Sequence, residues 1–230
     1  MMYRPQQRVK VRPTMRRNSV VAARAARFLT PAGKRAAGAD SRRSGEVMPP
    51  EKWHEPSDEP VQDFRIIVDP PGKGYRHVLT PEDIRERLAQ FPAQVLAGLE
   101  VVHLSAMTRK KKALPCYGMQ WGSAIYLYPV EETRIETFRR PPRPAQLIEA
   151  RMYGGCWRQQ GRVWQLVWTE EAIRDYYLNN ILIHELGHLV DQRNSSYVDR
   201  ERYAEWFAIA HGYLPTRPER AAGGQLSRHD

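Results

Sequence analysis

The chain has 230 residues, and its 36 Lys and Arg against 26 Asp and Glu give a formal net charge of +10. Its only cysteines, Cys116 and Cys156, lie far apart, which excludes a disulfide framework and a four-cysteine zinc ribbon. No apolar run approaches the roughly 20 residues of a transmembrane helix, and the length suits one domain of moderate size plus a tail.

The net charge is concentrated at the N-terminus. Residues 1–50 hold 12 Lys and Arg against 2 Asp and Glu, so the remaining residues are neutral overall. A disordered basic tail and Pro-rich linker are therefore predicted over residues 1–60, with Ser19 to Leu29 able to form a basic amphipathic helix. Such a tail suits weak contact with nucleic acid or an anionic membrane. Alternatively, it is a solubilising extension before a later start such as Met15 or Met48.

The N-terminal region does not read as an export signal. Arg16-Arg17 resembles a twin-arginine signal only faintly, because Arg24 and Arg27 interrupt what should be an apolar core. We therefore expect a cytoplasmic protein.

Three elements are predicted in the first half of the folded part. Phe64 to Val68 is typical of a short strand. Thr80 is an N-cap followed by Pro81 and two acids, which predicts a helix running to about Gln90. Leu99 to Leu104 is a buried strand.

The next segments are mainly β structure by the same criteria. Arg109 to Lys112 is interpreted as a solvated loop, and Gly122 to Tyr128 as another strand. Ala145 to Tyr153 and Arg162 to Trp168 are interpreted as further β structure. Several strands then precede two helices, which predicts an α+β fold. We expect core packing from one aromatic cluster: Trp157, Trp164, Trp168, Tyr176 and Tyr177.

The run His184-Glu185-Leu186-Gly187-His188 ends an apolar helix that Thr169 caps. Residues four apart share a helix face, so His184 and His188 are able to bind one metal ion. Glu185 completes the H-E-x-x-H arrangement of zinc peptidases, in which it acts as the general base. Gly187 indicates that something packs closely against this helix.

A catalytic zinc site needs a third protein ligand and an open position for water. Asp191 lies three residues after His188. Glu201 and Glu205 lie four apart on a second predicted helix, roughly Asp199 to His211, beyond a polar turn. The residues alone leave these three acids open as the third ligand.

The second helix carries a resemblance to a known family. Glu201 to Ala208 resembles the E-x-x-A-[DE]-x-F-A pattern that follows H-E-x-x-H in gluzincin peptidases. The closest likeness is to the anthrax lethal factor catalytic domain family, which also matches His184 to Asp191. The ImmA/IrrE-like and CAAX-prenyl peptidases are similar more loosely. The resemblance covers about residues 170–215.

The resemblance implies a zincin-like domain over residues 61–215, followed by a flexible tail at 216–230. In it a small mixed sheet packs on the active-site helix. Its edge strand lies beside the metal, and Ser123 to Tyr128 is either that strand or an ordinary core strand. The resemblance implies that Glu201 is the third zinc ligand and that Glu205 supports one of the ligands without binding the metal itself.

Further roles remain for the residues between and after these motifs. Asp191 is expected to orient a histidine or to pair with an Arg rather than to bind metal. Tyr197 is the first candidate for stabilising the oxyanion, and His211 the second.

The expected activity is zinc-dependent hydrolysis of a peptide or protein substrate. Zn²⁺ would be held by His184, His188 and Glu201, with Glu185 taking a proton from the attacking water. The rival is a non-catalytic binding protein on a zincin scaffold, with its basic tail on nucleic acid. The intact Glu185 favours the enzyme, since a purely structural site needs no general base.

Overall fold

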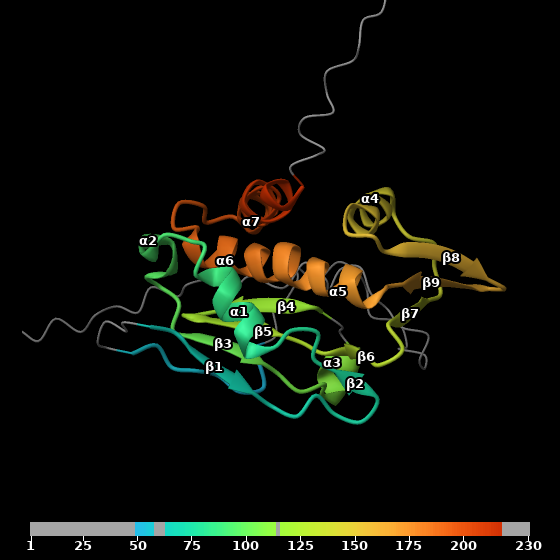
Figure 1. Cartoon of the computed structure of the whole chain (residues 1–230), viewed down its shortest axis with the longest axis horizontal. Helices are drawn as coiled ribbons and strands as arrows, with labels where there is room; N and C mark the ends of the chain where they lie inside the picture. The colour runs from blue at the N-terminus through green and yellow to red at the C-terminus, as the bar shows by residue number, and fades with distance from the viewer. Residues whose placement is uncertain (1–48, 58–62, 114–115, 218–230) are drawn as a thin grey trace, which may run out of the picture.

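The structure is a computed structural model that describes residues 49–57, 63–113 and 116–217 (Figure 1). Of the tail and linker predicted over residues 1–60, residues 1–48 and 58–60 lie outside the described residues, and so do residues 218–230 of the tail predicted over residues 216–230. The main sheet has the order β1-β3-β5-β4. Its strands β1, β3 and β5 are parallel, whereas β4 runs antiparallel to β5 and forms one edge. The bounds are β1 Arg65–Val68, β3 Val101–Leu104, β4 Gly118–Trp121 and β5 Ala124–Leu127.

Two smaller antiparallel sheets accompany it. One pairs β2 with β6, and the other has the order β7-β9-β8. The bounds are β2 Tyr75–Arg76, β6 Val130–Glu131, β7 Ile135–Phe138, β8 Cys156–Gln160 and β9 Val163–Val167. The sheets and helices together confirm the α+β class.

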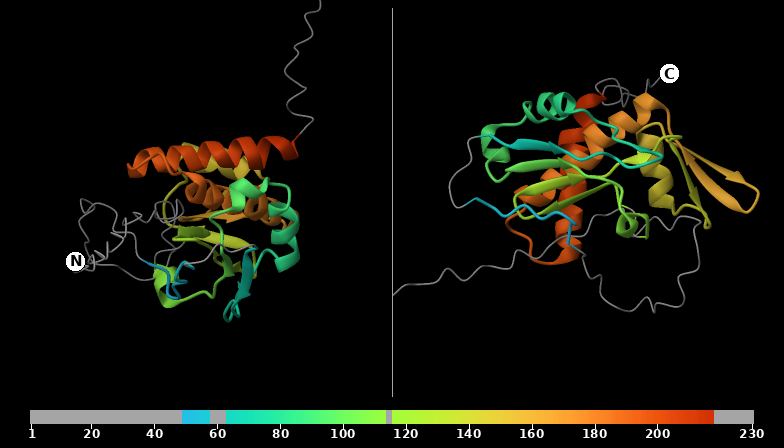
Figure 2. Two further views of the ribbon diagram at one scale, coloured as in Figure 1. Left: turned by 90° about the vertical axis from the view of Figure 1, so that its left-hand side faces the viewer. Right: turned by 90° about the horizontal axis from the view of Figure 1, so that it is seen from below.

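One long helix dominates the structure and is built from α5, a π-helical turn η2, and α6. It lies against one face of the main sheet, and α7 and α4 lie on its far side (Figures 1 and 2). The bounds along this part are α4 Pro144–Met152, α5 Glu170–Tyr176, η2 Tyr177–Ile181, α6 Leu182–Val190, α7 Tyr197–Ala208, π-helical η3 Ile209–Tyr213 and 3-10 helix η4 Leu214–Thr216. None of the helices in the described ranges has the length and apolarity that crossing a membrane requires.

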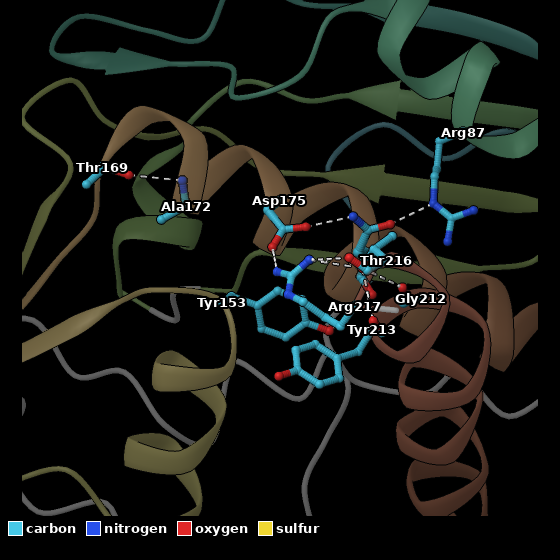
Figure 3. Close-up of polar contacts among 10 residues, drawn as sticks. Arg87, Tyr153, Thr169, Ala172, Asp175, Gly212, Tyr213, Thr216 and Arg217 are labelled. Atoms are coloured by element: carbon cyan, nitrogen blue, oxygen red, sulfur yellow. Dashed lines mark hydrogen bonds and ion pairs between the residues drawn. The ribbon is translucent and has the colours of Figure 1, made fainter. Parts of the chain in front are cut away.

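Three short helices precede them: α1 Pro81–Leu88, α2 Ala93–Leu96 and α3 Arg109–Ala113. The predicted cap of α1 is confirmed, because Thr80 Oγ1 accepts from the Asp83 N–H while the Asp83 carboxylate accepts from the Thr80 N–H. Thr169 caps α5 through the N–H of Ala172 in the same manner (Figure 3). The strands predicted near Phe64, Leu99 and Ile125 are also present.

Two predicted elements are wrong. Arg109 to Lys112 is not a solvated loop but the helix α3, whose Lys111 is buried with its Nζ 4.0 Å from the centre of the Tyr128 ring. Ala145 to Tyr153 is not a strand but the helix α4. Pro144 at its first position and Gln146, which accepts the Arg143 N–H, start a helix there.

The order of strands in the main sheet decides whether Ser123 to Tyr128 is an edge strand or a core strand. β5 lies between β3 and β4, so it is a core strand, and β4 is the edge strand. All four residues of β5 are buried.

Two π-helical turns cross where the long helix meets η3. A Cβ on Gly212 would lie 1.9 Å from the backbone oxygen of Asn179, so only glycine permits this contact. The Asn179 oxygen also accepts the Tyr153 hydroxyl at 3.2 Å. The π-helical turn η2 thus leads into α6 from a fixed crossing point.

A polar network closes around this crossing (Figure 3). The Asn179 side chain accepts from Arg87 Nε at 2.8 Å and donates to Asp175 at 2.7 Å. Asp175 also pairs with Arg217, and Arg87 donates to the carbonyl of His211 at 2.7 Å. These links join different elements, so the network holds α1, the long helix and the segment from His211 to Arg217 together.

Residues 49–57 run without regular structure over the main sheet, on the face that bears Tyr126. His54 stacks on Tyr126, and its Nε2 lies 3.1 Å from Nδ1 of His103. His103 Nε2 lies 3.1 Å from Asp69, which also binds Lys52 at 2.6 Å. Since Asp69 accepts only, His103 donates to Asp69 and accepts from His54. This chain of bonds requires a neutral His103, because its Nδ1 accepts, whereas the His54 ring donates in either charge state.

Prediction for the helix crossing. Gly212→Ala should lower the free energy of unfolding by about 2–3 kcal/mol, because the new Cβ overlaps backbone atoms that cannot move independently. The matched control is Gly98→Ala, whose Cβ would meet only the Leu189 side chain at 3.9 Å and should change stability by less than about 0.5 kcal/mol. Urea denaturation midpoints measure both. Equal midpoints for the two variants would refute the crossing.

Prediction for the segment 49–57. Burial lowers the pKa of both His54 and His103; Arg65 and Lys52 add to this for His54, and Asp69 opposes it. Release of the segment leaves His54 near its ordinary pKa of about 6.5, so attachment is strongest above that pH and weakens as the pH falls through it.

Hydrogen exchange of residues 49–57, normalised to the intrinsic rate, should therefore show less protection at pH 5 than at pH 7. His54→Gln keeps a donor that does not titrate, so it should reduce this pH dependence. Protection that is the same at both pH values in the wild type would contradict the bonding pattern.

Candidate metal centre

The two histidines of the motif lie on one face of α6, where every residue from Leu182 to His188 is buried. His184 Nε2 and His188 Nε2 are 3.1 Å apart. Both imidazole nitrogens thus converge on one point, as the i, i+4 spacing predicts.

A carboxylate from α7 meets the same point. Glu201 Oε1 lies 3.4 Å from His188 Nε2, and Glu201 Oε2 lies 3.9 Å from His184 Nε2. One ligand atom from each of these three residues lies within 4.8 Å of the others. Of the three acids left open by the sequence, Glu201 is therefore the one that joins the histidines.

The approach of α7 depends on small residues. A Cβ on Gly187 would lie 3.0 Å from Ala204 Cα and 3.0 Å from Phe207 Cβ. The close packing that Gly187 indicated is thus real, and its partner is α7. Larger residues at this contact would move Glu201 away from the histidines.

Arg200 ties the end of α6 to α7. Its guanidinium donates to the His188 carbonyl at 2.9 Å and to the Asp191 carbonyl at 2.8 Å. Because Arg200 precedes Glu201 directly, this contact sets where the Glu201 carboxylate stands. Nothing in the sequence pattern indicates this contact, since a lone Arg on a helix is usually solvated.

The arrangement fits a zinc ion. Tetrahedral ligand atoms at bond lengths of about 2.0–2.1 Å lie roughly 3.3 Å from one another. The two histidine nitrogens are 3.1 Å apart and Glu201 Oε1 lies 3.4 Å from His188 Nε2, both close to that value, while the other Glu201 oxygen lies 3.9 Å from His184 Nε2. Glu201 Oε1 and Glu185 Oε2 are buried without a hydrogen-bond partner in the described residues, and a cation would satisfy this charge.

Glu185 lies between α6 and the edge strand β4. A Cβ on Gly118 would lie 3.0 Å from Glu185 Oε1 and 2.7 Å from Ile181 Cγ2, so β4 reaches the carboxylate because it has glycine there. The backbone of Gln120 hydrogen-bonds the Glu185 carboxylate. Sequence analysis missed both residues, because β4 has no alternating pattern.

Burial is the main cause that raises the pKa of Glu185 well above its ordinary value, and the Glu201 carboxylate adds to it. The Gln120 hydrogen bond and the charge of Lys111 oppose this shift. Glu185 is thus a carboxylate that accepts a proton readily.

The other acids predicted near the site lie differently. The buried Asp191 carboxylate accepts the N–H groups of Arg193 and Asn194 at 3.2 and 3.1 Å, so it shapes the turn between α6 and α7. Glu205 is half-buried on α7, one helical turn beyond Glu201.

The two candidates for stabilising the oxyanion, Tyr197 and His211, lie at opposite ends of the helix formed by α7 and η3. Tyr197 is its first residue, four before Glu201, so both side chains project from the same face. His211 follows Glu201 by ten residues, about 15 Å along the helix. Its ring packs on Phe207 at a centroid distance of 4.4 Å, away from the histidines.

A pocket opens beside the motif. His184 and Glu185 belong to its lining, together with residues of α4. Its aromatic lining includes Trp157, Trp168 and Tyr176, three members of the cluster for which we expect core packing.

Comparison of the chain with protein-family models, with curated proteins and with solved structures gives no match. The likeness to gluzincin peptidases therefore rests on the motifs themselves.

Prediction for metal binding. Zinc at a free concentration 100 times its Kd should stabilise the fold by about 2.7 kcal/mol and raise the Tm by about 5–10 °C. Glu201→Gln should abolish this rise, since it removes a charged ligand, whereas Asp191→Asn and Glu205→Gln should retain it. Calorimetry and metal analysis of the purified variants measure the effect. A zinc-dependent rise that survives in Glu201→Gln would exclude Glu201 as the third ligand.

Proposed function

We propose that this protein is a zinc-dependent peptidase with a zincin-like fold. The observation that carries the proposal is the convergence of His184, His188 and Glu201, with Glu185 beside them against an edge strand. Its order of elements, a mixed sheet followed by an active-site helix and a helix bearing glutamate, supports the same reading.

When bound, a zinc ion would polarise a water molecule and the carbonyl of the scissile bond. Glu185 takes a proton from the attacking water and passes it to the leaving amine. Its buried, unpartnered Oε2 favours this transfer, because no hydrogen bond has to break first. Tyr197, on the same helix face as Glu201, is the proposed donor to the oxyanion.

The substrate is an extended peptide that adds to the outer edge of β4. This strand pairs only with β5 among the described residues, so its other edge is available for backbone hydrogen bonds. The edge lies beside Glu185, as the contact at Gly118 requires. A bound strand would bring one peptide bond next to the general base.

The rival function is a non-catalytic zincin-scaffold protein. A structural zinc site closes with four protein ligands. In the described residues the group has three members, and an acid with one unpartnered carboxylate oxygen, Glu185, stands next to it. These two features favour the peptidase.

Prediction for catalysis. Glu185→Gln should lower peptide hydrolysis by at least about 10²-fold, because the amide cannot accept the water's proton. Zinc content should stay at one per chain, since Glu185 is not a ligand. Hydrolysis of a mixed peptide library, followed by mass spectrometry, and metal analysis of the same sample measure both. Full activity in this variant would remove Glu185 as the general base.

A further inference from the structure

A half-buried carboxyl group lies behind two aromatic walls of the pocket beside the motif. Glu136, on β7, is hydrogen-bonded to Tyr117, just before β4, and to Trp168, just before α5. Both rings line the pocket together with His184 and Glu185. The contacts of Glu136 therefore help to set the shape of the space next to the candidate metal centre.

The Tyr117 hydroxyl stands equally close to both oxygens of this carboxyl group. It lies 2.7 Å from Glu136 Oε1 and 2.8 Å from Glu136 Oε2. A hydroxyl has one hydrogen to donate, so a carboxylate receives only one full hydrogen bond from it. A protonated carboxyl group exchanges two, because Oε2–H donates to the tyrosine oxygen while the tyrosine O–H donates to Oε1. The Trp168 indole N–H donates to the second lone pair of Oε1 at 3.2 Å.

The surroundings of Glu136 favour this neutral acid. Burial raises the pKa of Glu136 to about 7; the charge of Glu131 on β6 adds to the rise, and the hydrogen bonds from Tyr117 and Trp168 oppose it. Tyr177 in η2 is a further titratable neighbour, and burial raises the pKa of its hydroxyl well above the ordinary value, so it stays neutral. Glu136 has no ion pair with a cation within the described residues.

The two walls are joined to each other as well as to Glu136. The Trp168 ring stacks on Tyr176 at a centroid distance of 4.9 Å, and the Tyr117 ring meets Tyr176 edge-on at 5.4 Å. Within the described residues, Glu136 is the hydrogen-bond acceptor for both the Tyr117 hydroxyl and the Trp168 indole. A change at this one carboxyl group thus reaches both walls.

We propose that Glu136 is a pH-sensitive switch that holds the Tyr117 and Trp168 walls of the pocket when it is protonated and releases them when it is ionised. The neutral acid satisfies every polar atom of the contact. The ionised group lacks a cation and is better solvated by water, so ionisation favours an open arrangement in which its hydrogen bonds to the two rings are broken.

The direction of the pH effect follows from linkage. In the open arrangement Glu136 is solvated and has its ordinary pKa of 4.5, whereas in the closed arrangement its pKa is about 7. Closure is therefore strongest below the lower value, and it weakens as the pH rises through the range between the two. Above the higher value the effect is complete.

The direct test is the exchange of the Trp168 indole N–H with solvent, measured by NMR on the zinc-free full-length protein and divided by the intrinsic rate at each pH. Trp168→Phe identifies the signal among the six tryptophans. Protection in the wild type should fall at least about tenfold from pH 5 to pH 8. A wild-type protection that is equal at the two pH values would overturn the switch.

Glu136→Gln is the matched variant, because its amide N–H takes the place of the acid's O–H while Oε1 still accepts. It copies the protonated state, so its protection should not change with pH. Tyr117→Phe removes the reciprocal partner and should lower the protection at pH 5 at least about threefold. Glu171→Gln removes an exposed carboxylate on α5 outside the pocket and should keep the wild-type profile. Thermal melting confirms that each variant is folded.

An effect on substrate rests on the peptidase function proposed above. The zinc-loaded wild type and Glu136→Gln are compared on the peptide library at pH 6 and pH 8, and the ratio of their rates should change, because only the wild type releases the walls. A constant ratio would overturn the coupling of the switch to the pocket.

The outcomes also separate the two proposals. If peptides are hydrolysed while Trp168 protection in the wild type does not depend on pH, the switch is overturned and the peptidase stands. If protection falls with rising pH in the wild type and not in Glu136→Gln, but no peptide is hydrolysed, the switch stands and the peptidase falls.

Discussion

The close contact between α6 and α7 is the constraint on which the site depends. Gly187 on α6 lies against Ala204 on α7 with no room for a side chain between them. This contact, with Arg200 bound to the last carbonyls of α6, places Glu201 opposite two imidazoles. Without it, the histidines would be two buried polar groups with no common partner.

The opposite side of α6 has a matching contact. Gly118 lets the edge strand β4 come against Glu185, so the proposed general base stands where the proposed peptide on that edge would lie. The helix is therefore held between two glycine contacts, one beside the candidate metal ligands and one beside Glu185. The crossing of the π-helical turns at Gly212 fixes the middle of the same long helix (Figure 3).

Local chemistry made part of this predictable from the sequence. Local patterns predict the cap at Thr80 and the i, i+4 pair of His184 and His188, and the family pattern predicts Glu201. The structure contains the cap and brings Glu201 to the two histidines, as expected. The strand β4 and the helix α4 were missed, because tertiary packing decides them.

Zinc-edge X-ray absorption of the zinc-loaded protein tests the central claim most directly, because it counts the atoms around the ion. The account predicts two imidazoles and otherwise only oxygen ligands at about 2.0–2.1 Å, with no sulfur. A sulfur shell near 2.3 Å, which would place Cys116 or Cys156 on the ion, or a third imidazole would contradict it.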